Sequence, residues 1–138
     1  MAVYQKYLAA VEPLVEADNA GTAVWKIALS TTFTNTDTAF VAGTTDLATA
    51  NGYTAGGNTC TTVTAQQTAG TFKLVLAIPA TWVASSTGFT SRYAILYNST
   101  TNVPYAAWDY GSSVVMNGAN ADTFSVNLDA GTGVFQVA

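Results

Sequence analysis

Short runs with a period of two residues constrain this chain more than any other feature. The clearest is TFKLVLAI, residues 71–78, in which every second side chain is large and apolar, and Pro79 ends the run. Successive side chains of a β-strand point to opposite faces, so this period predicts a strand and not a helix with one apolar face. Proline cannot donate to a strand ladder, which explains why the run stops there.

Similar runs follow one another along the chain at intervals of about 8–12 residues. They occupy residues 24–30, 59–64, 92–98, 105–110, 112–116, 123–128 and 134–137, with a further short run at 81–84. Asn117-Gly118 lies between two of them, and Asn-Gly is the strongest short signal for a hairpin turn. The sequence therefore predicts a mainly β fold, an antiparallel β-sandwich or jelly roll.

Composition is consistent with a single domain over residues 1–138. Hydrophobic residues make up 49% of the chain, and charged residues only 9%, against about 25% in an average protein. Disordered chains combine low hydrophobicity with high net charge, which is the reverse of this pattern. No stretch approaches the roughly 20 apolar residues that a membrane-spanning helix needs, so no membrane partner is expected.

The first residues and one later segment depart from the period of two. The residues Tyr4, Tyr7, Leu8 and Val11 follow the i, i+3, i+4, i+7 spacing of a helical face. This spacing predicts a short helical lead within residues 1–18, which Pro13 ends or kinks. Residues 30–50 carry few apolar side chains, and we expect a long exposed loop there.

The sequence offers no set of residues that would carry out catalysis. It contains no histidine, which removes the commonest general base near neutral pH and the commonest metal ligand. Cys60 stands alone in a predicted strand with no basic neighbour, so we expect a small core residue. Glu12 and Glu16 fit a solvated helix face, and no acidic loop matches a calcium motif. No catalytic residue, metal ligand or cofactor is predicted.

Arg92 and Asp109 are the one basic and acidic pair predicted to lie within neighbouring strands. Alternation within residues 92–98 and 105–110 allows the two side chains to face each other. Such a pair is more often structural than catalytic. We therefore predict a structural ion pair in the wall of the sheet, surrounded by tyrosines that supply contact area.

Charge also limits the partners. The net charge is −4 and the four basic residues are widely separated, so nucleic acid is not expected as a partner. The sequence MAVYQKYLAAVEPLVEAD lacks the charged, apolar and small-residue order of a secretory signal. We expect synthesis in a cytoplasm.

Several motifs, taken in order, resemble one group of proteins. They are YQKYLAAVEPLVE (4–16), NGYTAGG (51–57), TFKLVLA (71–77), RYAILYN (92–98), WDYGSSV (108–114) and a closing GVFQV. Together they resemble small virion proteins that tailed double-stranded DNA bacteriophages encode among their structural genes. The resemblance spans about residues 4–137 and implies a non-enzymatic virion component made in a bacterial host. It transfers no binding residue and leaves head or tail open.

The leading hypothesis from this resemblance is a capsid decoration, or cement, protein on the virion surface. Its expected partners are the major capsid protein and other copies of itself, as a homo-dimer or homo-trimer. The predicted contact residues are Tyr4, Tyr7, Leu8, Val11, Phe33 and Phe40. The alternative is a tail or tail-fibre component that binds a host receptor or glycan, which exposed Trp108, Trp82 or Tyr53 would favour.

Overall fold

The computed structural model of the chain describes residues 2–7 and 21–137, and it is mainly β. Ten strands lie within this part of the chain, with one short 3-10 helix, η2 (Gly118–Asn120). The strands are β1 (Val3–Lys6), β2 (Trp25–Ser30), β3 (Asn58–Cys60), β4 (Thr62–Thr68), β5 (Thr71–Leu76), β6 (Trp82–Val83), β7 (Phe89–Asn98), β8 (Val103–Met116), β9 (Thr123–Phe124) and β10 (Phe135–Val137). The predicted strand class is therefore confirmed.

All the strand pairs are antiparallel, and they form three sheets. The largest has the order β1-β8-β7-β2-β3, the second has the order β10-β5-β4, and the third pairs β6 with β9. Long strands β7 and β8 form the centre of the first sheet, where Ile95 lies opposite Ala107 and Leu96 opposite Ala106. Small side chains on β8 beside branched ones on β7 allow the strands to be buried on both faces.

The predicted N-terminal helix is wrong where the structure describes it. Val3–Lys6 form strand β1, in which Tyr4 lies opposite Trp108 of β8. The backbone N–H of Tyr7 then donates to the carbonyl of Tyr105 at 3.3 Å. Short helices are marginal unless packing supports them, and here the pairing with β8 satisfies the backbone groups instead. The remainder of the predicted helix, including Leu8, Val11 and Pro13, lies outside the described residues.

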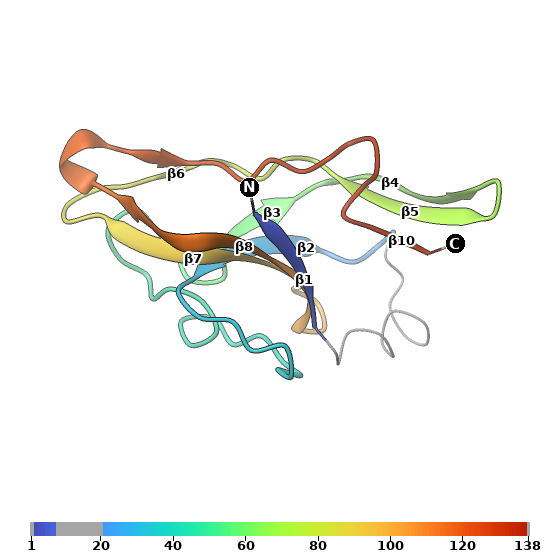
Figure 1. Ribbon diagram of the computed structural model, residues 1–138, viewed down its shortest axis with the longest axis horizontal. Helices are drawn as coiled ribbons and strands as arrows, with labels where there is room; N and C mark the ends of the chain where they lie inside the picture. The colour runs from blue at the N-terminus through green and yellow to red at the C-terminus, as the bar shows by residue number, and fades with distance from the viewer. Residues whose placement is uncertain (1, 8–20, 138) are drawn as a thin grey trace.

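One face of the five-stranded sheet packs against the two smaller sheets (Figure 1). Aromatic rings join these layers. Trp25 of β2 and Tyr105 of β8, both in the five-stranded sheet, meet edge to face with ring centroids 5.0 Å apart. Phe135 of β10, in the second sheet, lies 6.2 Å from Trp25 and so joins the two sheets. Further along β8, Tyr110 packs edge to face against Phe124 of β9 at 5.3 Å. The core therefore lies between strands that are far apart in the sequence.

The segment between β2 and β3 covers part of the other face of the five-stranded sheet and lies below that sheet in Figure 1. Most of residues 30–50 are exposed, but Phe40 and Asp46 are buried. The ring of Phe40 stacks on Tyr97 of β7 with centroids 3.8 Å apart and planes 12° apart. The loop that the sequence predicts to be exposed is thus fixed to the sheet at particular side chains.

Candidate functional surface

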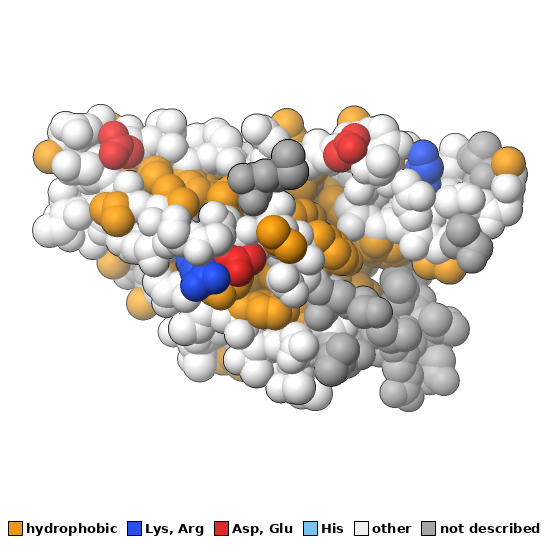
Figure 2. All heavy atoms as spheres, viewed as in Figure 1, with side chains coloured by type: hydrophobic (Ala, Val, Ile, Leu, Met, Phe, Trp, Pro, Cys, Tyr) orange, Lys and Arg blue, Asp and Glu red, His pale blue; other side chains and the backbone are white. Residues whose placement is uncertain are grey.

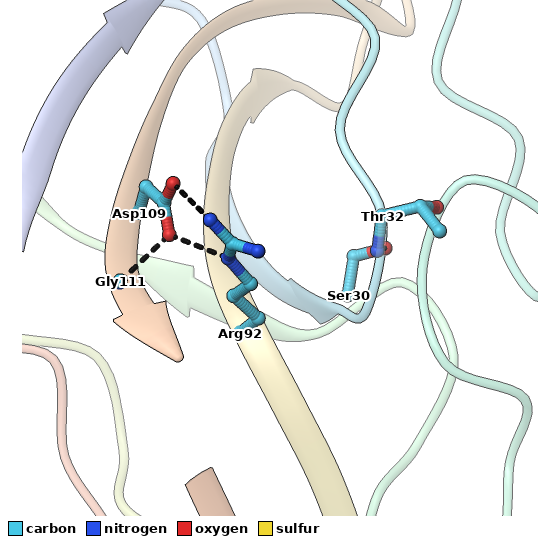
Figure 3. A network of polar contacts seen from close by, with 5 residues as sticks. All are labelled: Ser30, Thr32, Arg92, Asp109 and Gly111. Atoms are coloured by element: carbon cyan, nitrogen blue, oxygen red, sulfur yellow. Dashed lines mark hydrogen bonds and ion pairs between the residues drawn. The ribbon is translucent and has the colours of Figure 1, made fainter. Parts of the chain in front are cut away.

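Arg92 and Asp109 form the predicted ion pair, on adjacent strands β7 and β8. The Arg92 Nε donates to Asp109 Oδ1 at 2.8 Å, and its Nη2 donates to Oδ2 at 2.9 Å (Figure 3). Pairing between the strands shifts register between Ser91 and Tyr93, so Arg92 sits at an irregularity in β7. A bidentate geometry fixes the orientation of both planar groups.

The surroundings of the pair stabilise its charged form. The Arg92 guanidinium, with the backbone N–H of Gly111 at 2.8 Å, holds the pKa of the Asp109 carboxyl below its usual range. The carboxylate in turn raises the pKa of Arg92. A pair in which both groups are charged near neutral pH neither accepts nor releases a proton there. This geometry suits a structural clamp.

An aromatic row continues from the ion pair across the sheet. The Arg92 guanidinium carbon lies 5.1 Å from the centre of the Tyr93 ring. Phe33, from the loop after β2, stacks on Tyr93 at 5.7 Å and meets Tyr7 edge to face at 4.9 Å. This row attaches the start of the loop to the sheet, and it supplies packing area as predicted for the tyrosines.

The residues predicted to contact partners fall into different environments. Tyr4 is 47% exposed and meets Trp108 edge to face at 6.0 Å. Phe33 is half-buried between Tyr7 and Tyr93. Tyr7 and Phe40 are buried within the chain, which corrects their prediction as contact residues. Both rings pack where the loop after β2 contacts the sheet, Tyr7 against Phe33 and Phe40 against Tyr97. Leu8 and Val11 lie outside the described residues.

Asp46 organises the far end of the same loop, a role that the sequence did not reveal. Its Oδ1 accepts the backbone N–H of Gly43 at 2.6 Å, and its Oδ2 accepts the Tyr53 hydroxyl at 2.5 Å and the N–H of Gly56 at 2.7 Å. The Asp46 residue as a whole is 6% exposed. A buried charge requires such donors to offset its lost hydration. The available signal was a single acid between Gly43 and the glycine-rich stretch 51–57.

The groups that could have carried chemistry are placed in structural roles. Cys60 is buried in β3, and burial raises the pKa of its thiol to about 12, which keeps it protonated. Asp129 accepts the hydroxyl of Thr132 and two backbone N–H groups within one turn. Within the described ranges, no three Cys, Asp or Glu side chains gather as metal ligands would.

The surface between these features is neutral over large areas. In Figure 2 charged side chains are few, the basic and acidic groups that touch near the centre are of opposite charge, and hydrophobic side chains form a band between the upper and lower layers. Exposed apolar residues also occur on single strands, with Val3 57% exposed on β1, Val63 63% exposed on β4 and Val115 68% exposed on β8. Such a surface can be buried against a partner without stripping water from many charges.

Comparison with known proteins gives no relative: no family model matches the chain, and no curated protein or solved structure is significantly similar to it. Across the part of the chain that the structure describes, no helix has the length and apolar character required to cross a bilayer.

Proposed function

We propose that this protein is a non-enzymatic structural component of a bacteriophage virion, a decoration protein that binds the shell of the major capsid protein. The proposal combines the motif resemblance with the neutral, partly apolar surface of a β framework. It includes synthesis in the bacterial cytoplasm, location on the capsid surface and self-association as a dimer or trimer. We also propose that the layered sheets form a β-sandwich of the jelly-roll type.

The observation that carries the proposal is strand β1. This strand lies at the edge of the five-stranded sheet, bonded on one side to β8. Val3 and Tyr4 point to opposite faces of the strand, and 57% and 47% of their surfaces are exposed. A partner that covers this edge would bury apolar area on both faces of the strand and satisfy its outward backbone groups.

Repetition explains how a contact of this size can strengthen a shell. A decoration protein occupies many equivalent positions, and linked copies bind with an avidity that exceeds the affinity of one copy by about 10²–10⁴. Since the binding surface holds few charges, the contact should depend weakly on salt. Burial of surface area would supply the binding free energy, and no turnover of a small molecule is expected.

The direct test measures binding to shells assembled from the major capsid protein of the same genome. Wild-type protein should co-sediment with the shells in many copies per particle and raise the temperature at which they disassemble. The double variant Val3→Ser/Tyr4→Ser should bind more weakly by an order of magnitude or more. Val83→Ser/Val115→Ser is the matched control, because it removes two exposed apolar side chains from β6 and β8.

Two results would reject the decoration role. One is a virion that contains only a handful of copies by quantitative gel densitometry. The other is equal loss of shell binding in both double variants, which would show that β1 has no particular part in it. Melting temperatures of the isolated variants should be measured first, so that lost binding is not confused with lost fold.

The alternative, a tail component that binds a glycan, is supported by only one of its three aromatic residues. Trp82 and Tyr53 are buried, at 3% and 2% exposure, and only Trp108 among the three is half-buried at the surface. Sugars stack on exposed aromatic faces. A glycan array probed with wild-type protein and Trp108→Ala would favour the tail role if it gave a signal that the variant lost.

A further inference from the structure

Strand β4 is the longest strand at a sheet edge, and no strand of the described chain covers its outer side. In the order β10-β5-β4 it bonds to β5 alone. The other edge strands have between two and four residues, whereas β4 has seven. The end of β8 also extends past β1, but Gly111 with φ of 81° interrupts its extended backbone. The outer side of β4 therefore offers the most regular row of free backbone groups.

The sequence of β4 lacks most devices that prevent such an edge from pairing. Natural edge strands carry lysine, proline or inward-pointing charges, or are kept very short. Residues 62–68 read TVTAQQT, with no charge and no proline. A register shift between Thr62 and Thr64 is the single irregularity, and from Thr64 onward each residue pairs in sequence with β5. Val63, beside that shift, is 63% exposed.

We propose that β4 pairs antiparallel with β4 of a second copy around a twofold axis, so that the three-stranded sheets of two copies become one six-stranded sheet. A twofold axis perpendicular to the sheet keeps each side chain on its own face, and it brings together positions of the same parity. With the axis at Ala65, Thr64 of each copy lies opposite Gln66 of the other. Both pairs are neutral.

Charge is the reason that the occupant is a second copy. The chain carries a net charge of −4, so contacts between two copies that involve its acidic side chains would bring like charges together. The paired β4 strands would bring none together, since neither contains an ionisable side chain. Thr–Gln pairs across the axis can also hydrogen-bond on the strand surface. The inference specifies the self-association included in the proposed function, but it requires no capsid for its test.

The test is the solution mass of the isolated full chain, by sedimentation equilibrium over a range of concentrations. Wild type should approach twice the single-chain mass of 14.3 kDa as concentration rises. The variant Thr64→Lys/Gln66→Lys places two like-charged pairs across the axis and should stay monomeric. Ser113→Lys/Val115→Lys is the control, because it adds the same charge at exposed positions of β8 and should still dimerise.

A charge-swap experiment separates lost pairing from lost folding. Thr64→Glu/Gln66→Glu should also be monomeric alone, but an equal mixture with the lysine variant should form heterodimers of mixed mass. A wild type that remains monomeric at all concentrations would overturn the proposal. So would a lysine variant that still dimerises, monomeric charge variants that fail to combine, or growth of wild type into open fibres. Shell binding by a monomeric variant would leave the decoration role intact.

Discussion

The phenol of Tyr53 connects the buried carboxylate of Asp46 to the central strand β2. Its hydroxyl donates to Asp46 Oδ2 at 2.5 Å, and its oxygen accepts the backbone N–H of Leu29 at 3.0 Å. The loop between β2 and β3 is therefore held to the sheet by one continuous chain of hydrogen bonds. Tyr97 adds a second connection, because its hydroxyl donates to the carbonyl of Gly56 at 2.7 Å.

Replacing the central acceptor should loosen this loop. In Asp46→Ala, three donors lose their partner, two of them in buried hydrogen bonds, and we expect the free energy of unfolding to fall by about 3 kcal/mol. Urea denaturation measures this fall directly. Asp37→Ala, at a half-buried position of the same loop, is the control and should change stability by less than about 1 kcal/mol. A fall below about 1 kcal/mol for Asp46→Ala would show that water replaces the carboxylate.

Burial of several hydroxyls predicts a loss of stability in alkali. Burial raises the pKa of Tyr97 to about 12, and it raises the pKa of Tyr7 and Tyr53 above the ordinary value as well. The unfolded chain releases these protons near pH 10 while the folded chain keeps them, so the unfolded state binds fewer protons above that pH. The free energy of unfolding should therefore fall as the pH rises from about 10 to 12.

Urea denaturation at a series of pH values measures this dependence, and tyrosinate absorbance reports the ionisation itself. The variant Tyr97→Phe lacks one of the buried phenols, and its stability should fall less steeply over the same pH range. Equal slopes in the two proteins would mean that Tyr97 ionises as readily in the folded state as in the unfolded state.

The strands could be predicted because their signal is local. Alternation in residues 71–78 depends only on neighbouring residues, and Thr71–Leu76 form strand β5. The hairpin predicted at Asn117-Gly118 is wrong, because Asn117 caps the 3-10 helix η2, and β8 and β9 on either side of it pair in different sheets. The N-terminus could not be predicted in the same way, since Val3–Lys6 become a strand through pairing with β8, about a hundred residues later. Helical spacing of Tyr4 and Tyr7 was a local pattern that a distant contact overrode.

The ion pair was predictable and the Asp46 network was not, for a related reason. Arg92 and Asp109 lie on consecutive strands, so alternation and a hairpin connection bring them together. Asp46 lies in a loop without periodicity, and its donors come from Gly43, Tyr53 and Gly56 at irregular distances along the chain. The burial of Phe40 likewise depends on Tyr97, more than fifty residues away.

Two glycines with left-handed backbones should respond very differently to alanine. Gly57 has φ of 66°, and a Cβ there would lie 2.0 Å from the carbonyl oxygen of Ile27. Gly70 has φ of 88°, and a Cβ there would meet nothing within 4 Å. Gly57→Ala should therefore lose more than about 3 kcal/mol of stability or fail to fold, while Gly70→Ala should lose about 1 kcal/mol. Thermal melting of both variants checks the difference, and equal losses would mean that β2 yields to the added methyl group.

Removing the charge of Asp109 should lower stability only slightly and leave shell binding unchanged. Asp109→Asn keeps one oxygen for Arg92 Nε and Gly111, so most of the geometry survives, and a partly exposed pair contributes little net free energy. We expect a fall in melting temperature of a few degrees at most.

The same pair makes stability depend on pH in acid. The pKa of Asp109 is lowered in the folded state, so its contribution to the free energy of unfolding is present above about pH 4 and is lost as the pH falls through the folded pKa. Wild type and variant should therefore converge in melting temperature in acid. A variant that melts like wild type at pH 7 but no longer binds shells would instead identify Asp109 as a residue that contacts the partner.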